Sequence, residues 1–221
     1  MLSSAVLQII ALVSMTIDHI GYYFLPDCTP LRIIGRLAFP LFVFMLVEGY
    51  KHTRSLPKYF LRIIIAAVAA QIVIYALAVT RGFSYTHNTL FTLAFALAAL
   101  YFTERGKWYL VFVPIIALIP SALNCDYGAF GVFMAVAFYY ADRLFADNRA
   151  LRVISQAIVL FAVMPSCAAY SDWWVLNWAV LAIIPIALYS GKKGRRLPKF
   201  FSYVYYPAHL LVALIVQLLF F

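Results

Sequence analysis

Long apolar stretches separated by short polar loops dominate the chain. Nine of them are long enough to span a bilayer or nearly so, and we predict that each forms a helix, since about 20 apolar residues cross a membrane. Several middle stretches hold only about 15 to 18 residues. Because a short stretch is sometimes re-entrant, we predict nine spanning helices, give or take one. The nine stretches are Ala5–Phe24, Leu31–Tyr50, Tyr59–Val79, Tyr85–Phe102, Lys107–Leu123, Tyr127–Leu144, Val153–Cys167, Trp173–Tyr189 and Phe200–Phe221.

Composition agrees with this pattern. Of 221 residues, 66% are hydrophobic and only 11% are charged, and the mean hydropathy is +0.94. Soluble domains contain about 25% charged residues. We therefore predict an all-α, polytopic transmembrane bundle in which residues 1–221 form a single membrane domain. The first stretch follows no basic segment and precedes no small-residue cleavage site, so we expect a retained helix rather than a signal peptide.

The basic residues favour one orientation. Alternate loops carry most of them, and the positive-inside rule places such loops in the cytoplasm. An odd number of crossings then puts the N-terminus in the cytoplasm and the C-terminus in the periplasm, across a bacterial inner membrane. The net charge of +9 is thereby explained by topology and contact with anionic lipid, without nucleic acid. The residues of these loops are Lys51, Arg54, Lys58, Arg62, Arg105, Lys107, Arg143, Arg149, Arg152, Lys192, Lys193, Arg195, Arg196 and Lys199.

Three ionisable residues interrupt the first two apolar stretches. Each of Asp18, His19 and Arg36 costs roughly 3 kcal/mol within a bilayer. Helix rise places all three at a similar depth in the outer half of the membrane, so we expect Asp18 to contact Arg36. His19 points elsewhere, since adjacent residues do not share a helix face, and we expect it to line a cavity. Pro40 is expected to kink the second helix. The alternatives are a buried polar network that only fixes packing, and Arg36 either as counter-ion or as ligand contact.

Other polar residues are weaker candidates. Glu48 and His52 share a face at the cytoplasmic end of the second stretch, although an interfacial polar turn accounts for them equally well. Asn88 is placed to cap the fourth helix, and capping alone would explain it. Tyr206 and His209 lie three residues apart in the last stretch, where a histidine is more often structural.

The cysteines leave two possibilities open. Cys28, Cys125 and Cys167 fall in or beside outer loops, where an oxidising periplasm allows one disulfide, but three free thiols fit equally. No cysteine or histidine pair has the spacing of metal ligands, so no metal site is predicted.

Several motifs resemble the TraX family of membrane proteins. They are MTIDHIG, IGRLAFPLFVFMLVEGYKHT and KYFLRI in the first 63 residues, with NTLFTLAFAL and YGAFGV later in the chain. This family is associated with N-terminal acetylation of conjugative pilin, and it is distantly similar to acyltransferases that pass acyl groups across membranes. The resemblance implies a membrane acetyltransferase that takes an acetyl group from cytoplasmic acetyl-CoA. The acceptor would be an amine or hydroxyl of a protein, sugar or lipid on the periplasmic side.

The resemblance also implies roles for residues. His19 matches the first-helix histidine proposed as catalytic base, through direct transfer or an acyl-histidine, with Asp18 and Arg36 around it. Candidates for acetyl-CoA binding are His52, Arg54, Lys58, Arg62 and Glu48. Candidates for substrate binding are Asn88, Tyr206 and His209. Membrane lipid is a further expected partner, and homo-oligomerisation is left open.

Two other functional classes remain. A proton-coupled small-solute transporter would use Asp18, His19 and Arg36 as a relay, but transporters usually carry internal repeats and interrupted helix pairs, and neither is evident. A non-catalytic scaffold for pilus or envelope assembly would tolerate neutralisation of the same three residues.

Overall fold

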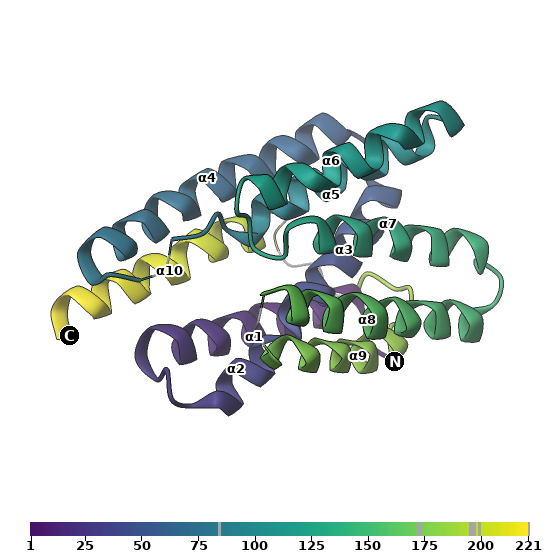
Figure 1. The fold of residues 1–221 in the computed structure, drawn as a ribbon. Coiled ribbons are helices and arrows are strands. Elements are labelled where there is room, and N and C mark those ends of the chain that lie inside the picture. The colour runs from purple at the N-terminus through teal and green to yellow at the C-terminus, as the bar shows by residue number, and fades with distance from the viewer. Residues whose placement is uncertain (84, 172–173, 195–197, 199, 221) are drawn as a thin grey trace.

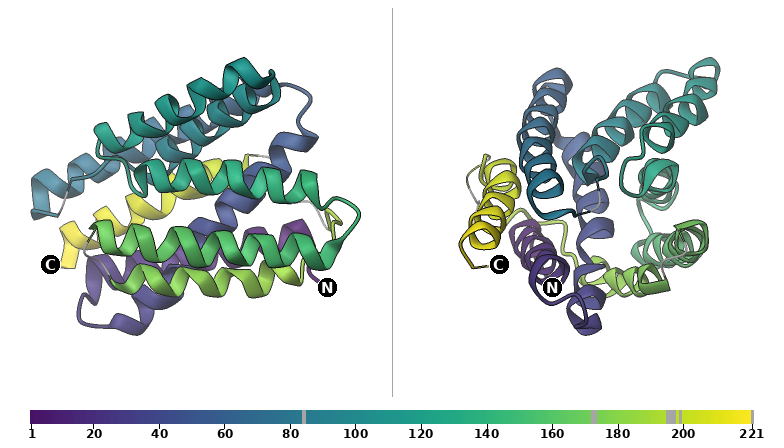
Figure 2. Two further views of the ribbon diagram at one scale, coloured as in Figure 1. Left: turned by 45° about the vertical axis from the view of Figure 1, so that its right-hand side comes forward. Right: turned by 60° about the vertical axis from the view of Figure 1, so that its left-hand side comes forward.

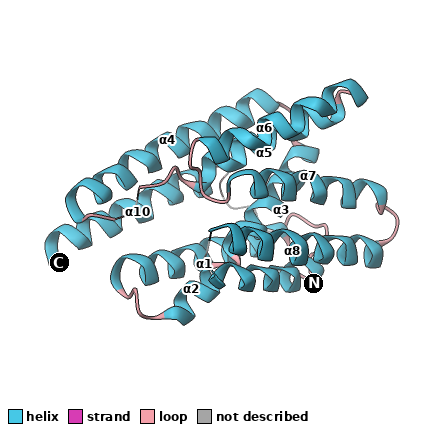
Figure 3. Ribbon diagram, in the orientation of Figure 1, coloured by secondary structure: helices cyan, strands magenta, loops and turns pink. Residues whose placement is uncertain are grey.

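A computed structural model describes residues 1–83, 85–171, 174–194, 198 and 200–220, and its regular secondary structure is entirely helical (Figure 3). Within these residues the fold class is therefore all-α, as predicted. The elements are α1 (Ser4–Phe24), α2 (Thr29–Gly35), α3 (Ala38–His52), α4 (Leu56–Arg81), α5 (Thr89–Glu104), the 3-10 helix η1 (Lys107–Val111), α6 (Phe112–Ala122), α7 (Gly128–Leu144), α8 (Arg149–Ser171), the 3-10 helix η2 (Trp174–Ala182), α9 (Ile183–Ala187) and α10 (Phe201–Phe220).

Each predicted stretch corresponds to one helical rod in the described part of the chain. Three rods are composite, since α2 continues into α3, η1 into α6 and η2 into α9. Five rods there are long and apolar enough to cross a membrane: α1, α2 with α3, α4, α8 and α10. The predicted starting residue of the eighth stretch, Trp173, and the last residue, Phe221, lie outside the described residues.

The second stretch is interrupted rather than continuous. The helix was predicted to run from Leu31 to Tyr50 with a kink, but α2 ends at Gly35 and α3 begins at Ala38. At the break, the amide of Arg36 donates to the Ile33 carbonyl at 3.1 Å, a tighter turn than an α-helix makes. Pro40 explains the position, because proline has no N–H to bond the carbonyl four residues earlier.

Helix ends follow local capping chemistry. The fourth predicted stretch was expected to begin at Tyr85, but its helix α5 begins at Thr89, because the side chain of Asn88 accepts from the amide of Leu90 at 3.1 Å, as the capping interpretation of Asn88 predicted. α4 ends where Gly82 adopts a left-handed conformation at φ 68°, which glycine takes without steric cost.

The two chain ends lie at opposite ends of the bundle (Figure 1). Near the N-terminus, the Leu2 amide donates to the Leu188 carbonyl at 2.7 Å, and Arg149 donates to the Ala187 carbonyl at 2.7 Å. At the other end, Gln217 of α10 bonds backbone of α1 and Arg81 of α4 bonds Gln217 in turn. Figure 2 shows the rods alternating in direction, so every second loop returns to the N-terminal end.

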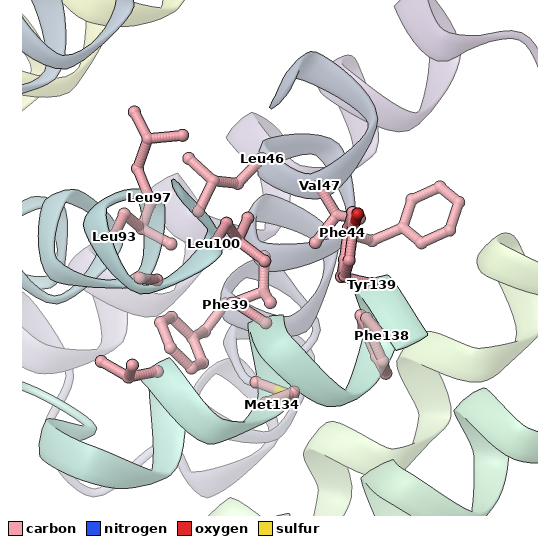
Figure 4. Close-up of a cluster of buried hydrophobic side chains, with 14 of the residues drawn as sticks. Phe39, Phe44, Leu46, Val47, Leu93, Leu97, Leu100, Met134, Phe138 and Tyr139 are labelled. Carbon is pink, nitrogen blue, oxygen red and sulfur yellow. The ribbon is translucent and has the colours of Figure 1, made fainter. Parts of the chain in front are cut away.

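The core lies where α3, α5 and α7 meet. Phe39 and Phe44 of α3 pack with Leu97 of α5 and Phe138 of α7, all of them buried (Figure 4). Close approach depends on Gly131, where a Cβ atom would lie 2.6 Å from Thr92 and 2.7 Å from Phe39. Small residues at helix contacts are typical of membrane bundles. This packing fixes α3 and hence the break that precedes it.

Candidate active site

Asp18 forms ion pairs with two arginines from the adjacent rod. It contacts Arg36 at the break between α2 and α3, and Arg32 of α2 with 3.1 Å between Nη1 and Oδ1. Arg36 also donates from Nε to the Arg32 carbonyl at 3.2 Å. The predicted contact of Asp18 with Arg36 is confirmed, whereas the contact of Asp18 with Arg32 was not predicted. Arg32 lies four residues before Arg36, and this spacing indicates that the two side chains lie on the same face of a helix.

A second polar group, Asp126 of the α6–α7 loop, lies beside these ion pairs. Its carboxylate is hydrogen bonded to the side chains of Thr86 and Thr89. Burial raises the pKa of Asp126, and nearby Arg36 opposes that shift. Tyr127 accepts from Arg36 Nη1 at 3.4 Å and stacks on a core ring of α3. Sequence reasoning missed these loop residues because their proximity to the first two rods is set by tertiary packing.

His19 of α1 is paired with His209 of α10. The two ring nitrogens, Nδ1 of His19 and Nε2 of His209, are 2.6 Å apart, and the ring planes differ by only 7°. The structure therefore brings together two histidines that are 190 residues apart in the chain. Tyr206, the third candidate on this side, packs edge-on to both, with ring centroids 6.5 Å from His19 and 5.5 Å from His209.

The histidine pair lines a cavity between α1 and α10 of about 440 Å³. His19 thus lines a cavity, as its position beside Asp18 predicted. The other lining side chains are mostly apolar, and polar groups come mainly from Thr16 and Tyr205, whose hydroxyls are 2.7 Å apart. The mouth lies on the outer apolar surface, since Ile20 and Val212 of the lining are 40% and 59% exposed.

A second cavity of about 230 Å³ lies toward the N-terminal end of the bundle. Its polar lining includes Gln8, Ser202 and Tyr203, and its inner end is formed partly by Tyr206. Tyr206 also contacts both histidine rings, so this side chain borders both the second cavity and the histidine pair.

The predicted donor-binding residues do not converge on one point. His52, Arg54 and Lys58 are exposed around the turn between α3 and α4. Arg62 lies beside the second cavity, with its guanidinium 5.9 Å from the ring centre of Tyr203. Glu48 does not line the second cavity.

Glu48 instead joins an ion network at the same end. It pairs with Lys51, which also pairs with Asp142, and it accepts from the hydroxyl of Tyr189 at 3.2 Å. The ring of His52 contacts the Glu48 backbone carbonyl at 2.8 Å rather than its carboxylate. The alternative of an interfacial polar turn therefore describes this pair better.

The side chain of Asn88 forms hydrogen bonds with neighbouring segments of the chain. Besides capping α5, its amide nitrogen donates to the Ala67 carbonyl and to Gln71, both at 2.9 Å. It lines neither of the two cavities described above. The capping alternative accounts for Asn88, and a role in substrate binding stays a prediction.

All three cysteines are free thiols. Cys125 and Cys167 are buried and Cys28 is half-buried. Burial and the neighbouring Asp126 raise the pKa of Cys125, in the loop between α6 and α7, to about 11.

Similarity to known proteins shows the family of this chain. The family model described as TraX protein matches residues 3–217. This chain belongs to the TraX family. Protein TraX of Escherichia coli is 30% identical over 94% of this chain and 84% of its own length. A probable fimbrial assembly protein FimC, serogroup H1, of Dichelobacter nodosus is 34% identical over 92% of this chain and 91% of its own. No solved structure matches the chain.

The TraX match includes both ends of the candidate site. His19 on the first rod and His209 on the last both lie within residues 3–217. A shorter match, 48% identical over 30% of this chain, is to the uncharacterized protein RP591 of Rickettsia prowazekii.

Proposed function

We propose that this TraX family protein is a membrane-bound acetyltransferase. It moves an acetyl group from cytoplasmic acetyl-CoA to an amine or hydroxyl on the periplasmic side. The observation that carries the proposal is the hydrogen-bonded histidine pair lining a cavity, with a second cavity behind Tyr206. Histidine is the side chain best suited to accept a proton near neutral pH.

The proposed topology follows from the helix directions and the basic loops. Residues 1–221 form one membrane domain in the bacterial inner membrane, with the N-terminus in the cytoplasm. Every second connection returns to the end of the bundle where the N-terminus lies (Figure 2). The helix ends and loops of these connections carry Lys51, Arg105, Arg149 and Lys192, and such basic segments stay on the cytoplasmic side. The C-terminus, at the opposite end, is then periplasmic.

Acetyl-CoA fits the cytoplasmic side of this arrangement as the substrate. Its phosphates would meet Arg54, Lys58 and Arg62, exposed cations that suit phosphate groups. Arg62 lies over Tyr203, which lines the second cavity, so a cation and a partly polar cavity adjoin each other at this end. Tyr206 at the inner end then lies between this cavity and His19.

The proposed chemistry is direct transfer with His19 as general base. The acceptor amine attacks the thioester carbonyl carbon and passes a proton to a ring nitrogen of His19. The new C–N bond forms, the C–S bond breaks, and the CoA thiolate takes the proton back from His19. Asp18 and Arg36 bind each other across the two rods and hold α1 in place, which favours the counter-ion alternative for Arg36.

The acceptor is proposed from the relatives. One of them is named as a probable fimbrial assembly protein, and the N-terminal amine of a pilin subunit is the acceptor that fits this name. A sugar or lipid amine would use the same chemistry.

The test is acetyl transfer by purified protein in lipid nanodiscs. Radiolabelled acetyl-CoA is supplied with a peptide bearing a pilin-like N-terminal amine. His19→Ala should lower transfer at least ~100-fold, the usual contribution of a general base, without weakening acetyl-CoA binding. His87→Ala is the matched control, because His87 contacts the Leu123 carbonyl outside the site. Full transfer by His19→Ala excludes this mechanism.

A further inference from the structure

The hydrogen bond between the two histidines runs in the plane of their rings. Parallel rings stacked face to face stand about 3.5 Å apart, the ordinary contact distance of carbon atoms. Nδ1 of His19 and Nε2 of His209 are only 2.6 Å apart, while the ring centres are 4.8 Å apart and the planes differ by 7°. The rings therefore meet edge to edge, with a lone pair of one nitrogen directed at the hydrogen of the other.

The backbone of α10 decides the direction of this hydrogen bond. Nδ1 of His209 lies 2.9 Å from the carbonyl oxygen of Tyr205. A carbonyl oxygen only accepts, so Nδ1 of His209 carries the hydrogen. A neutral imidazole has one N–H, and Nε2 of His209 is then an acceptor. The hydrogen between the two rings must belong to Nδ1 of His19.

The opposite direction would require a charged His209. That ring would carry hydrogens on both nitrogens inside a mostly apolar cavity. A charge within the bilayer is costly unless it is paired, and no carboxylate pairs with His209 among the described residues. The neutral arrangement is favoured.

We propose that His209 is a positioning residue that holds His19 as its Nδ1–H tautomer and leaves Nε2 of His19 free as the base. The proposal rests on the function proposed above. The hydrogen bond that one imidazole nitrogen makes sets the protonation of the other. Among the described residues nothing hydrogen bonds Nε2 of His19, so its lone pair is available to an acceptor amine.

The hydrogen bond between His19 and His209 becomes stronger during the proposed reaction. When Nε2 of His19 takes a proton from the amine, the ring becomes an imidazolium and its Nδ1–H donates a charge-assisted hydrogen bond to His209. Such bonds are roughly twice as strong as neutral ones. His209 therefore stabilises the charged form of His19 without touching substrate itself, through a chain that ends at the Tyr205 carbonyl.

The direct test is nitrogen-15 NMR of histidine-labelled protein in nanodiscs, which reports which ring nitrogen carries the hydrogen. Wild-type His19 should show hydrogen on Nδ1. His209→Gln should preserve this, because its amide oxygen can take the place of Nε2 as acceptor. His209→Phe keeps an aromatic ring but offers no acceptor, so His19 should lose its single tautomer. His52, which bonds the Glu48 carbonyl through Nδ1, is an internal control that should not change.

Activity supplies the second readout. His209→Gln should retain acetyl transfer within about tenfold of wild type, whereas His209→Phe should lose at least ~100-fold. Both should bind acetyl-CoA normally. An unchanged His19 tautomer in His209→Phe, a doubly protonated His209 in wild type, or equal losses in both variants would overturn the proposal. A wild-type protein without acetyl transfer would remove the proposed function, while the tautomer itself would still be decided by NMR.

Discussion

The side chain of Asp18 fills the space that a Cβ atom on Gly35 would need. A Cβ built there would lie 2.5 Å from Cγ of Asp18 and still closer to Cβ and Oδ1. α1 and α2 therefore approach each other at a glycine, and the carboxylate reaches both arginines across that contact. This is a steric requirement rather than a conformational one, since Gly35 is an ordinary helical residue.

Substitution of Gly35 by alanine should displace Asp18. Alanine favours a helix by up to about 1 kcal/mol over glycine, but overpacking costs about 1–3 kcal/mol, and here the displaced group is an ion pair. We expect Gly35→Ala to lower the unfolding free energy measured in detergent by about 3 kcal/mol. Gly21→Ala is the control, because its Cβ would meet Leu31 at 3.0 Å and the flexible side chain of Arg32 at 3.1 Å. Equal effects of the two variants would contradict this account.

Neutralising Asp18 should cost more than neutralising either arginine. Asp18→Asn leaves two guanidinium groups without their carboxylate, and breaking a buried pair typically costs about 3–5 kcal/mol. Arg32→Gln leaves the contact with Arg36 in place and should cost clearly less. The double change Asp18→Asn with Arg36→Leu should recover only part of the loss, because Arg32 stays behind. Thermal unfolding in detergent measures all three, and full recovery by the double variant would count against the three-residue arrangement.

Periodicity and hydropathy were sufficient for the helices, because each apolar stretch must form its own backbone hydrogen bonds in a membrane. Hydropathy did not predict the break in the helix at Arg36, although Pro40 indicated a kink nearby. Hydropathy alone placed the start of α5 at Tyr85, whereas the capping predicted for Asn88 from its residue type gives the observed start at Thr89.

The site was predicted in part. Asp18 with Arg36 followed from matched depth along two neighbouring helices. The pairing of His19 with His209 did not, because it joins the first and last rods, and no rule of spacing relates residues 190 positions apart. Asp126 was missed for the same reason, since loop packing alone brings it near Arg36.

Tyr206 should control passage between the two cavities. Tyr206→Trp enlarges a side chain that lines the second cavity and should reduce acetyl transfer markedly, with little change in binding of CoA phosphates. Tyr206→Phe loses only the hydroxyl that bonds Thr89 and should keep most of the activity. Calorimetry with acetyl-CoA, beside the transfer assay, separates the two steps. Wild-type rates with Tyr206→Trp would show that the donor takes another path.

Cys125 should react slowly with alkylating reagents at neutral pH. The thiolate is the nucleophile, and a pKa raised to about 11 leaves the thiol protonated until strongly alkaline pH. In a variant with Cys28→Ser and Cys167→Ser, iodoacetamide labelling followed by mass spectrometry should rise steadily from pH 8 toward about 11. The denatured protein should label readily near pH 8.5, the ordinary pKa of cysteine. Rapid labelling of the folded protein at pH 7 would contradict the burial of this thiol.

Reporter fusions should place the two ends of the bundle on opposite sides of the membrane. Fusions after Lys58, Lys107, Ala146 and Lys193 should be active in the cytoplasm, and fusions after Pro26 and Phe221 in the periplasm. The basic loops provide the physical reason. A cytoplasmic C-terminus would rule out an odd number of crossings and the transfer of acetyl groups to the outer side.

The cavity between α1 and α10 has a consequence for the fate of an acetyl thioester. Its mouth is bordered by exposed apolar side chains such as Ile20 and Val212, so hydrocarbon tails rather than bulk solvent lie outside it in a bilayer. Water is the most abundant competing nucleophile for any activated acyl group, and hydrolysis would consume the thioester without acetylating the acceptor. Under the proposed function, His19 would be a base that faces lipid, which would keep water scarce at the reacting thioester. An acceptor carried within the membrane would then have the advantage over one that arrives in solution.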